Sequence, residues 1–170
     1  MNIYVIGYMA SGKSTLVHAL EQQTGRPSID TDEQIQQRSR KSCYELVKAF
    51  GEEIFRKMEH ELLREICQQT NLLVATGGGL PCYANNMSLM NQTGVTVYLR
   101  WNVENLAIRA ELSGIDKRPL MAGLRGEDLR SFISRHLADR IRYYEQARYI
   151  IDCDGMTDEQ IAKQVMRDLL

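Results

Sequence analysis

The chain has 170 residues, which suits one globular domain with a single core, and we expect residues 1–170 to form that domain. Its 44% hydrophobic and 25% charged residues are ordinary, and a net charge of -1 gives no reason to expect nucleic acid or an anionic membrane as a partner. No apolar run approaches the roughly 18 residues of a membrane span, and the N-terminal apolar run is too short for a secretory signal. We therefore expect a cytoplasmic protein.

Apolar, strand-like runs alternate with stretches of helical periodicity along the chain. Strands are predicted at residues 2–6, 27–29, 72–75, 95–99 and 149–152. Helices are predicted at 14–24, from Thr31 to the break at Gly51, and at 52–69, 84–90, 103–111, 127–147 and 158–170. This alternation predicts an α/β fold, a parallel sheet with helices on both faces.

Three details of this pattern can be checked against a structure. Thr31 is the expected N-cap of its helix, with Gln34 completing a capping box. The buried face of the helix at 52–69 is expected to carry the apolar residues spaced four apart, Ile54, Met58, Leu62 and Ile66. Residues 112–126, "LSGIDKRPLMAGLRG", are rich in glycine and cations and lack periodicity, which predicts a mobile lid.

The stretch after the first strand, "GYMASGKST", has the G-x-x-x-x-G-K-S pattern of a phosphate-binding loop, or P-loop. Backbone N–H groups of such a loop converge on phosphates, Lys13 neutralises their charge, and the Ser14 hydroxyl completes a Mg²⁺ shell. The motif tolerates Ala10, provided that residue 10 adopts a backbone conformation open to a Cβ. A simple glycine-rich turn is the alternative, but the preceding strand and following helix favour nucleotide binding.

Carboxylates end the second strand at Asp30 and Asp32. In an open parallel sheet the carboxyl ends of the strands face the ligand crevice, so both side chains should lie near the phosphates. One could hold a magnesium-bound water, and the other could orient or deprotonate an acceptor hydroxyl. The alternative is that Asp32 only stabilises the N-terminus of its helix.

The third strand is followed by three consecutive glycines at residues 77–79, which are costly in chain entropy. A backbone that approaches a ligand explains them best, and a plain turn is the alternative. Arg56 lies four residues after Glu52, so a helical ion pair competes with any ligand for it.

Two further arginines lack a local partner in the sequence pattern. Arg118, inside "KRPL", lies in the predicted lid, where a cation could close over a transferring phosphoryl group. Arg140 has no carboxylate three or four positions away in its helix, so its partner is expected elsewhere, such as a ligand carboxylate held by two hydrogen bonds.

Taken in order, "GYMASGKST", "IDTD", "FGEEIFRKMEHELL", "TGGG", "KRPL" and "RIRYYEQA" resemble the shikimate kinase family nearly end to end. The resemblance implies a three-layer P-loop kinase of the nucleoside-monophosphate-kinase type, with a five-stranded sheet in the order 2-3-1-4-5 and a lid. It implies transfer of the γ-phosphoryl group of ATP to the 3-hydroxyl of shikimate, in aromatic amino-acid biosynthesis. The expected partners are ATP and shikimate, the expected cofactor is Mg²⁺, and we expect a monomer.

The resemblance also implies a role for each motif residue. The residues that it implies for nucleotide binding are Ala10, Ser11, Gly12, Lys13, Ser14, Thr15 and Arg118. It implies that Ser14 binds Mg²⁺, with Asp30 helping through water. For shikimate it implies Asp32 and Gly78 at the hydroxyls and Arg56 and Arg140 at the carboxylate. Lys13, Asp32 and Arg118 are the implied catalytic residues, and Arg109 is placed beside the adenine.

The chain departs from the family pattern in places. Ala10 replaces a glycine, and "RIRYYEQA" lacks the proline often found after the arginine, so Arg142 is a rival for the role of Arg140. A gluconate-kinase-like enzyme is one alternative function, against which the glycine run and "KRPL" argue. A non-catalytic module that senses nucleotide or shikimate is another, against which the intact Lys13, Asp32 and Arg118 argue.

Overall fold

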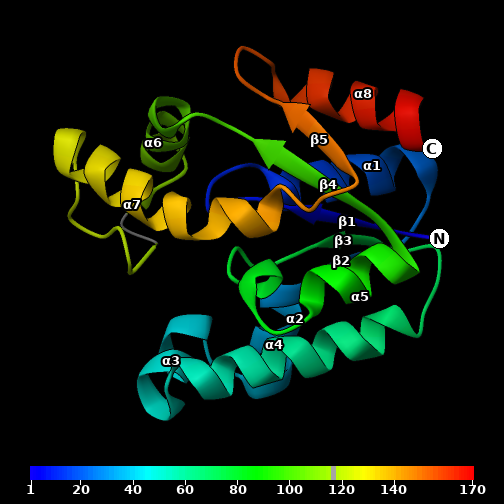
Figure 1. Ribbon diagram of the computed structural model, residues 1–170, viewed down its shortest axis with the longest axis horizontal. Helices are drawn as coiled ribbons and strands as arrows, with labels where there is room; N and C mark the ends of the chain where they lie inside the picture. The colour runs from blue at the N-terminus through cyan, green and yellow to red at the C-terminus, as the bar shows by residue number, and fades with distance from the viewer. Residues whose placement is uncertain (116–117) are drawn as a thin grey trace.

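The computed structural model describes residues 1–115 and 118–170 (Figure 1). Its strands are β1 (Asn2–Ile6), β2 (Ser28–Asp30), β3 (Leu73–Ala75), β4 (Gly94–Arg100) and β5 (Tyr149–Asp152). Its helices are α1 (Lys13–Thr24), α2 (Thr31–Ser39), α3 (Cys43–Phe50), α4 (Glu52–Cys67), α5 (Asn86–Thr93), α6 (Val103–Leu112), α7 (Gly126–Tyr144) and α8 (Asp158–Leu169), with a 3₁₀ turn η1 (Leu80–Cys82). The five predicted strands are present, with ends that shift by at most one residue.

The strands form one parallel sheet in the order β2-β3-β1-β4-β5. Figure 1 shows α1 and α8 on one side of this sheet and α4 and α5 on the other. Every residue of β1 and of β3 is buried, as expected for central strands covered on both faces. The predicted three-layer α/β fold and its strand order are confirmed. Within the described residues, no helix is long and apolar enough to cross a membrane.

The strand register brings the functional motifs to one edge of the sheet. Ala75 at the end of β3 pairs with both Val5 of β1 and Asp30 of β2. The P-loop, the Asp30–Asp32 segment and the three glycines therefore leave the sheet side by side. In a parallel sheet all the carboxyl ends lie at this edge, which is where ligands bind.

The start of α2 differs from the prediction. Asp30, not Thr31, is the N-cap, and its carboxylate accepts hydrogen bonds from the backbone N–H groups of Asp32 and Glu33. Thr31 is fully buried, and its hydroxyl instead accepts a hydrogen bond from the N–H of Gly77 at 2.8 Å. The predicted capping box is wrong because an aspartate one position earlier is an equally good cap and Thr31 is needed to join β2 to the glycine run.

The segment between Thr31 and Gly51 holds two helices rather than one. Arg40 takes a left-handed conformation with φ 56° and ends α2, and Ser42 then caps α3 in a capping box with Glu45. The predicted face of α4 is also partly wrong, since Ile54 is 44% exposed. The side chains of α4 that are buried are Phe55, Glu59, Leu62, Leu63 and Ile66, because a strict four-residue step drifts around a helix of 3.6 residues per turn.

Candidate active site

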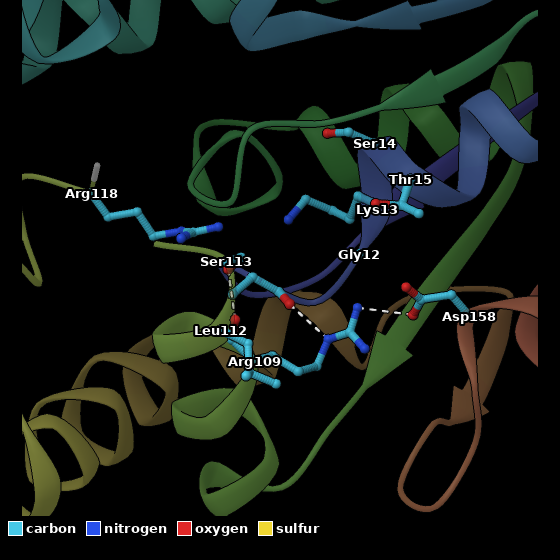
Figure 2. A pocket seen from close by; sticks show the side chains of 10 residues that line it. Gly12, Lys13, Ser14, Thr15, Arg109, Leu112, Ser113, Arg118 and Asp158 are labelled. Atoms are coloured by element: carbon cyan, nitrogen blue, oxygen red, sulfur yellow. Dashed lines mark hydrogen bonds and ion pairs between the residues drawn. The ribbon is translucent and has the colours of Figure 1, made fainter. Parts of the chain in front are cut away.

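The loop between β1 and α1 forms the floor of a cavity of about 470 Å³. The cavity is lined by Ala10, Gly12, Lys13, Ser14, Thr15, Arg109, Leu112, Ser113, Arg118 and Asp158. Figure 2 shows the side chains of Lys13 and Arg118 pointing toward one another from the P-loop and the chain after α6. The residues predicted to bind the nucleotide thus line one cavity, except Ser11, which is buried.

Two positions of the loop show how its backbone is shaped. Gly12 takes φ 94°, a conformation that residues with a Cβ rarely adopt, and a Cβ there would lie 2.7 Å from the Nη2 atom of Arg109. A larger residue would therefore be strained and would displace that guanidinium group. Ala10 takes φ 64°, in the left-handed region. That region admits a Cβ at a cost of about 1–2 kcal/mol. The backbone at residue 10 therefore accommodates an alanine, with a strain that a glycine would not carry.

Lys13 is folded back onto its own loop. Its ammonium group donates to the carbonyl oxygens of Gly7 at 3.0 Å and Tyr8 at 2.8 Å. Burial lowers the pKa of Lys13 to about 8, although the carboxylates of Asp32 and Asp30 oppose this shift. At pH 7 the side chain is therefore still mostly protonated and can neutralise an anion that enters the cavity.

Ser14 and Asp30 meet beside Lys13. The Ser14 hydroxyl donates to the Asp30 carboxylate at 2.5 Å, and the second oxygen of the same carboxylate caps α2. The hydroxyl and the carboxylate are two oxygen ligands of the kind that Mg²⁺ prefers, and they lie together at the start of α1. In kinase sites Mg²⁺ takes only one or two protein ligands and completes its shell with phosphate oxygens and water, so this pair fits the ion.

Asp32 lies where the second strand end meets the glycine run. A Cβ on Gly77 would lie 2.5 Å from the Asp32 Oδ1 atom and 2.8 Å from the Glu59 Oε1 atom. Burial, followed by the charge of Asp30, raises the pKa of Asp32, while Lys13 and Arg56 oppose the rise. Asp32 is thus a partly buried carboxyl group whose pKa is raised by burial and lowered by nearby cations. Perturbed pKa values of this kind are typical of functional sites.

Arg56 reaches the same place from α4. It donates to Glu59 at 2.6 Å and to Glu52 at 3.0 Å, so the local ion pair that the sequence allowed is present. A Cβ on Gly79 would collide with its guanidinium group. The glycine run therefore serves a purpose that the sequence did not indicate: it makes room for the side chains of Asp32, Glu59 and Arg56.

Arg140 and Arg142 lie differently on α7. The Nη1 atom of Arg140 lies 3.2 Å from the position that a Cβ on Gly78 would take, so this half-buried arginine points at the glycine run. Among the described residues no ion pair joins it to a carboxylate. Arg142 is exposed and stacks over Tyr143, 4.9 Å from its ring centroid. Of the two rivals, Arg140 is the one that points at the glycine run, which Arg56 and Asp32 also approach.

Arg109 and Arg118 border the cavity from the side of α6. Arg109 donates to the Ala10 carbonyl at 2.9 Å and pairs with Asp158 at 2.9 Å (Figure 2). Arg118 donates weakly to the Gly114 carbonyl at 3.4 Å, and burial lowers its pKa. In the predicted lid, Ile115 and Met121 are buried in the core. The lid prediction also covers Asp116 and Lys117, which lie outside the described residues.

Two residues of this site escaped the sequence reasoning. Glu59 is 1% exposed, and burial raises its pKa to about 7 despite the Arg56 charge. Its signal was available, since it is a carboxylate on the apolar face of α4 between Phe55 and Leu63. Tyr144, also fully buried, donates to the Gly78 carbonyl at 2.6 Å and fixes the glycine run against α7. Nothing local in the sequence indicates that contact.

A parallel sheet with a P-loop, a basic cavity and a carboxylate–arginine cluster next to it defines a P-loop kinase that acts on a small molecule. The sequence profile of the family described as shikimate kinase matches residues 9–170. A shikimate kinase from Parabacteroides distasonis is 37% identical over 168 residues, covering 99% of this chain and 96% of the relative.

Solved structures agree with the sequence comparison. The crystal structure of shikimate kinase from Bacteroides thetaiotaomicron has a TM-score of 0.90 at 36% identity and covers 98% of this chain and 95% of its own. Shikimate kinase from Acinetobacter baumannii in complex with shikimate has a TM-score of 0.86 at 30% identity, covering 98% and 90%. The chain belongs to the shikimate kinase family and is an ATP-dependent small-molecule kinase.

Proposed function

We propose that this chain transfers the γ-phosphoryl group of ATP to the 3-hydroxyl of shikimate, giving shikimate 3-phosphate and ADP. The observation that carries the proposal is the cluster of Asp32, Arg56 and Arg140 around the glycine run, directly beside the phosphate loop. A rigid anionic ring needs cations for its carboxylate and an acceptor for its reacting hydroxyl. This cluster offers two arginines and one aspartate for those tasks.

The P-loop residues Ala10 to Thr15 are assigned to the ATP phosphates. Lys13 would exchange its contacts with the Gly7 and Tyr8 carbonyls for phosphate oxygens, which is favourable because the ligand is anionic. Ser14 would hold Mg²⁺ directly and Asp30 through a water, and the bound ion would neutralise charge on the phosphates. The 2.5 Å contact between Ser14 and Asp30 supports this pairing.

Asp32 is assigned to the acceptor. A carboxylate held near the phosphate loop can orient the shikimate hydroxyl and take its proton as the oxygen–phosphorus bond forms. Arg118 would move from its weak contact with Gly114 to the transferring group and offset the charge that develops there. Gly78, whose carbonyl is fixed by Tyr144, would bind a second part of the ring through its backbone.

All of these groups come from one chain, so the proposed reaction needs no second copy, and we expect a monomer that works in the cytoplasm. The alternatives are a gluconate-kinase-like enzyme and a non-catalytic sensor of nucleotide or shikimate. Both make different predictions for turnover.

A coupled assay of ADP release with shikimate, gluconate and nucleoside monophosphates tests the proposal. We expect turnover with shikimate and little above background with the others. Lys13→Ala and Asp32→Asn should each nearly abolish turnover while circular dichroism shows an intact fold. Preferred turnover of gluconate, or binding of ATP with no turnover of any acceptor, would select one of the alternatives. A kcat of Asp32→Asn within about threefold of wild type would remove Asp32 from the reaction.

A further inference from the structure

Trp101 is the chain's single tryptophan, and the proposed chemistry leaves it without a role. It follows β4 directly and is 6% exposed, packed beneath the P-loop. Its indole Nε1–H donates to the carbonyl oxygen of Ser11 at 3.0 Å. A buried indole usually finds some partner, but this partner lies in the loop that is assigned to the nucleotide.

Arg109 extends this contact to the preceding residue of the loop, Ala10. Its guanidinium group lies over the Trp101 ring, 4.6 Å from the centroid, and donates to the Ala10 carbonyl at 2.9 Å. Asp158, the first residue of α8, pairs with the same guanidinium group at 2.9 Å (Figure 2). We call Trp101, Arg109 and Asp158 the loop brace. It joins β4, α6 and α8 to two consecutive carbonyls of the P-loop.

The brace supplies two of the hydrogen bonds that the loop carbonyls accept. Those of Gly7 and Tyr8 accept from Lys13, those of Ala10 and Ser11 accept from the brace, and that of Gly12 accepts from the N–H of Leu16. In the part of the chain that the structure describes, no hydrogen bond uses the N–H groups of Gly12, Lys13 or Ser14. With these five carbonyls bonded within the protein, the loop offers the N–H groups of Gly12, Lys13 and Ser14 as donors to an anion.

The brace also acts where the loop is strained. Ala10 holds a left-handed conformation that costs about 1–2 kcal/mol, and such a conformation persists only when its surroundings fix it. The bonds of Arg109 to Ala10 and of Trp101 to Ser11 fix the two peptide groups on the C-terminal side of that strain. Losing one of them should let the loop relax away from the shape that binds phosphate.

We propose that Trp101 is a positioning residue for the nucleotide phosphates: it holds the Ser11 carbonyl directly and the Ala10 carbonyl through the stacked Arg109. This inference rests on the proposed function, because it takes the P-loop to be the ATP site. Trp101 bonds to the P-loop and stacks against Arg109, and neither contact leads to Asp32, Arg56 or Arg140, which are assigned to the acceptor. Its loss should therefore weaken nucleotide binding selectively.

Trp101→Phe keeps an aromatic face for Arg109 but removes the N–H donor, and Trp101→Leu removes both. We expect Trp101→Phe to raise the Kd for ADP, measured by calorimetry, and the KM for ATP by about threefold to tenfold, the effect of one neutral hydrogen bond. Trp101→Leu should raise both further. The KM for shikimate should change by less than about twofold in each variant.

Tyr4→Phe is the matched control, because it removes a buried hydroxyl that bonds to Thr93 near the amino end of β4, away from the P-loop. It should lower the melting temperature without changing the Kd for ADP. The inference is overturned if Trp101→Phe and Trp101→Leu leave ADP binding unchanged, or if they raise the constants for both substrates alike in proportion to their loss of stability. In either case shikimate turnover by the wild type would still stand. A wild type that bound no ADP would overturn the proposed function and this inference together.

Discussion

Arg56 and Glu59 form an ion pair of 2.6 Å beside the glycine run, and its two members differ in exposure. The Arg56 side chain is 17% exposed, whereas that of Glu59 is 1% exposed. Burial raises the pKa of Glu59 from an ordinary value of 4.5 to about 7, even though Arg56 favours the ionised form. A carboxyl group that changes charge near neutral pH thus lies against an arginine assigned to the substrate carboxylate.

The first prediction is a pH dependence of stability that Glu59→Gln removes. Because the pKa of Glu59 is higher in the folded than in the unfolded chain, the folded state holds the proton more tightly. The free energy of unfolding should therefore fall as pH rises from about 4.5 through about 7, by up to about 1.4 kcal/mol per pH unit from this group. Denaturant unfolding at pH 5.5 and 7.5 should show a shallower fall for Glu59→Gln than for wild type.

Glu61→Gln is the control for this first prediction. It removes one negative charge from the same helix, but its side chain is 65% exposed and its ion pair is with Arg64 at 3.7 Å. Its pH dependence should follow wild type. Equal slopes for wild type and Glu59→Gln would show that Glu59 does not carry a proton near neutral pH.

The second prediction concerns the left-handed residue of the P-loop. Ala10→Gly should relieve about 1–2 kcal/mol of backbone strain, while the more flexible unfolded chain costs about 0.4–1 kcal/mol. The variant should therefore be more stable by up to about 1.6 kcal/mol in denaturant unfolding, the difference between the two effects. Ala19→Gly makes the same change inside α1, where glycine costs about 0.5–1 kcal/mol. A loss of stability in Ala10→Gly as large as that in Ala19→Gly would contradict the strain.

The parts of the site that could be predicted from sequence are those whose chemistry is local. The P-loop needs glycines, a lysine and a serine at fixed spacing, so one short stretch of sequence locates it. The same stretch locates the end of β1, because that strand ends where the apolar run ends. Asp30 was found for the same reason, although its capping role was given to Thr31. The competing caps differ by a single position, and only the tertiary contact of Thr31 with Gly77 decides between them.

The parts that could not be predicted depend on contacts between distant residues. The glycine run was noticed, but its physical reason lies in α4, since Gly79 makes room for Arg56. The Trp101 contact joins residues 90 positions apart, and the Tyr144 contact with Gly78 joins residues 66 apart. Periodicity and motif spacing carry no information on such pairs, because they follow from how helices pack on the sheet edge.

The last prediction separates Arg140 from Arg142 as the partner of the substrate carboxylate. Arg140 points at the glycine run near Arg56, and Arg142 is exposed on Tyr143. Arg140→Lys should raise the KM for shikimate much more than that for ATP, because lysine keeps the charge but loses the planar pair of donors that meets a carboxylate.

Arg140→Ala should lower kcat/KM for shikimate by roughly 30-fold or more, since truncating one partner of a desolvated charge pair costs about 2–5 kcal/mol. Arg142→Ala is the control, two positions away on another face of α7, and it should change neither KM appreciably. Initial rates with one substrate varied and the other saturating provide both constants, and thermal unfolding checks that the fold is kept. A structural role for Arg140 would lower stability and affect both substrates alike. If Arg142→Ala raised the KM for shikimate and Arg140→Ala left it unchanged, the substrate carboxylate would be assigned to Arg142. Arg142 would then have to leave its contact with Tyr143 to reach Arg56 and the glycine run.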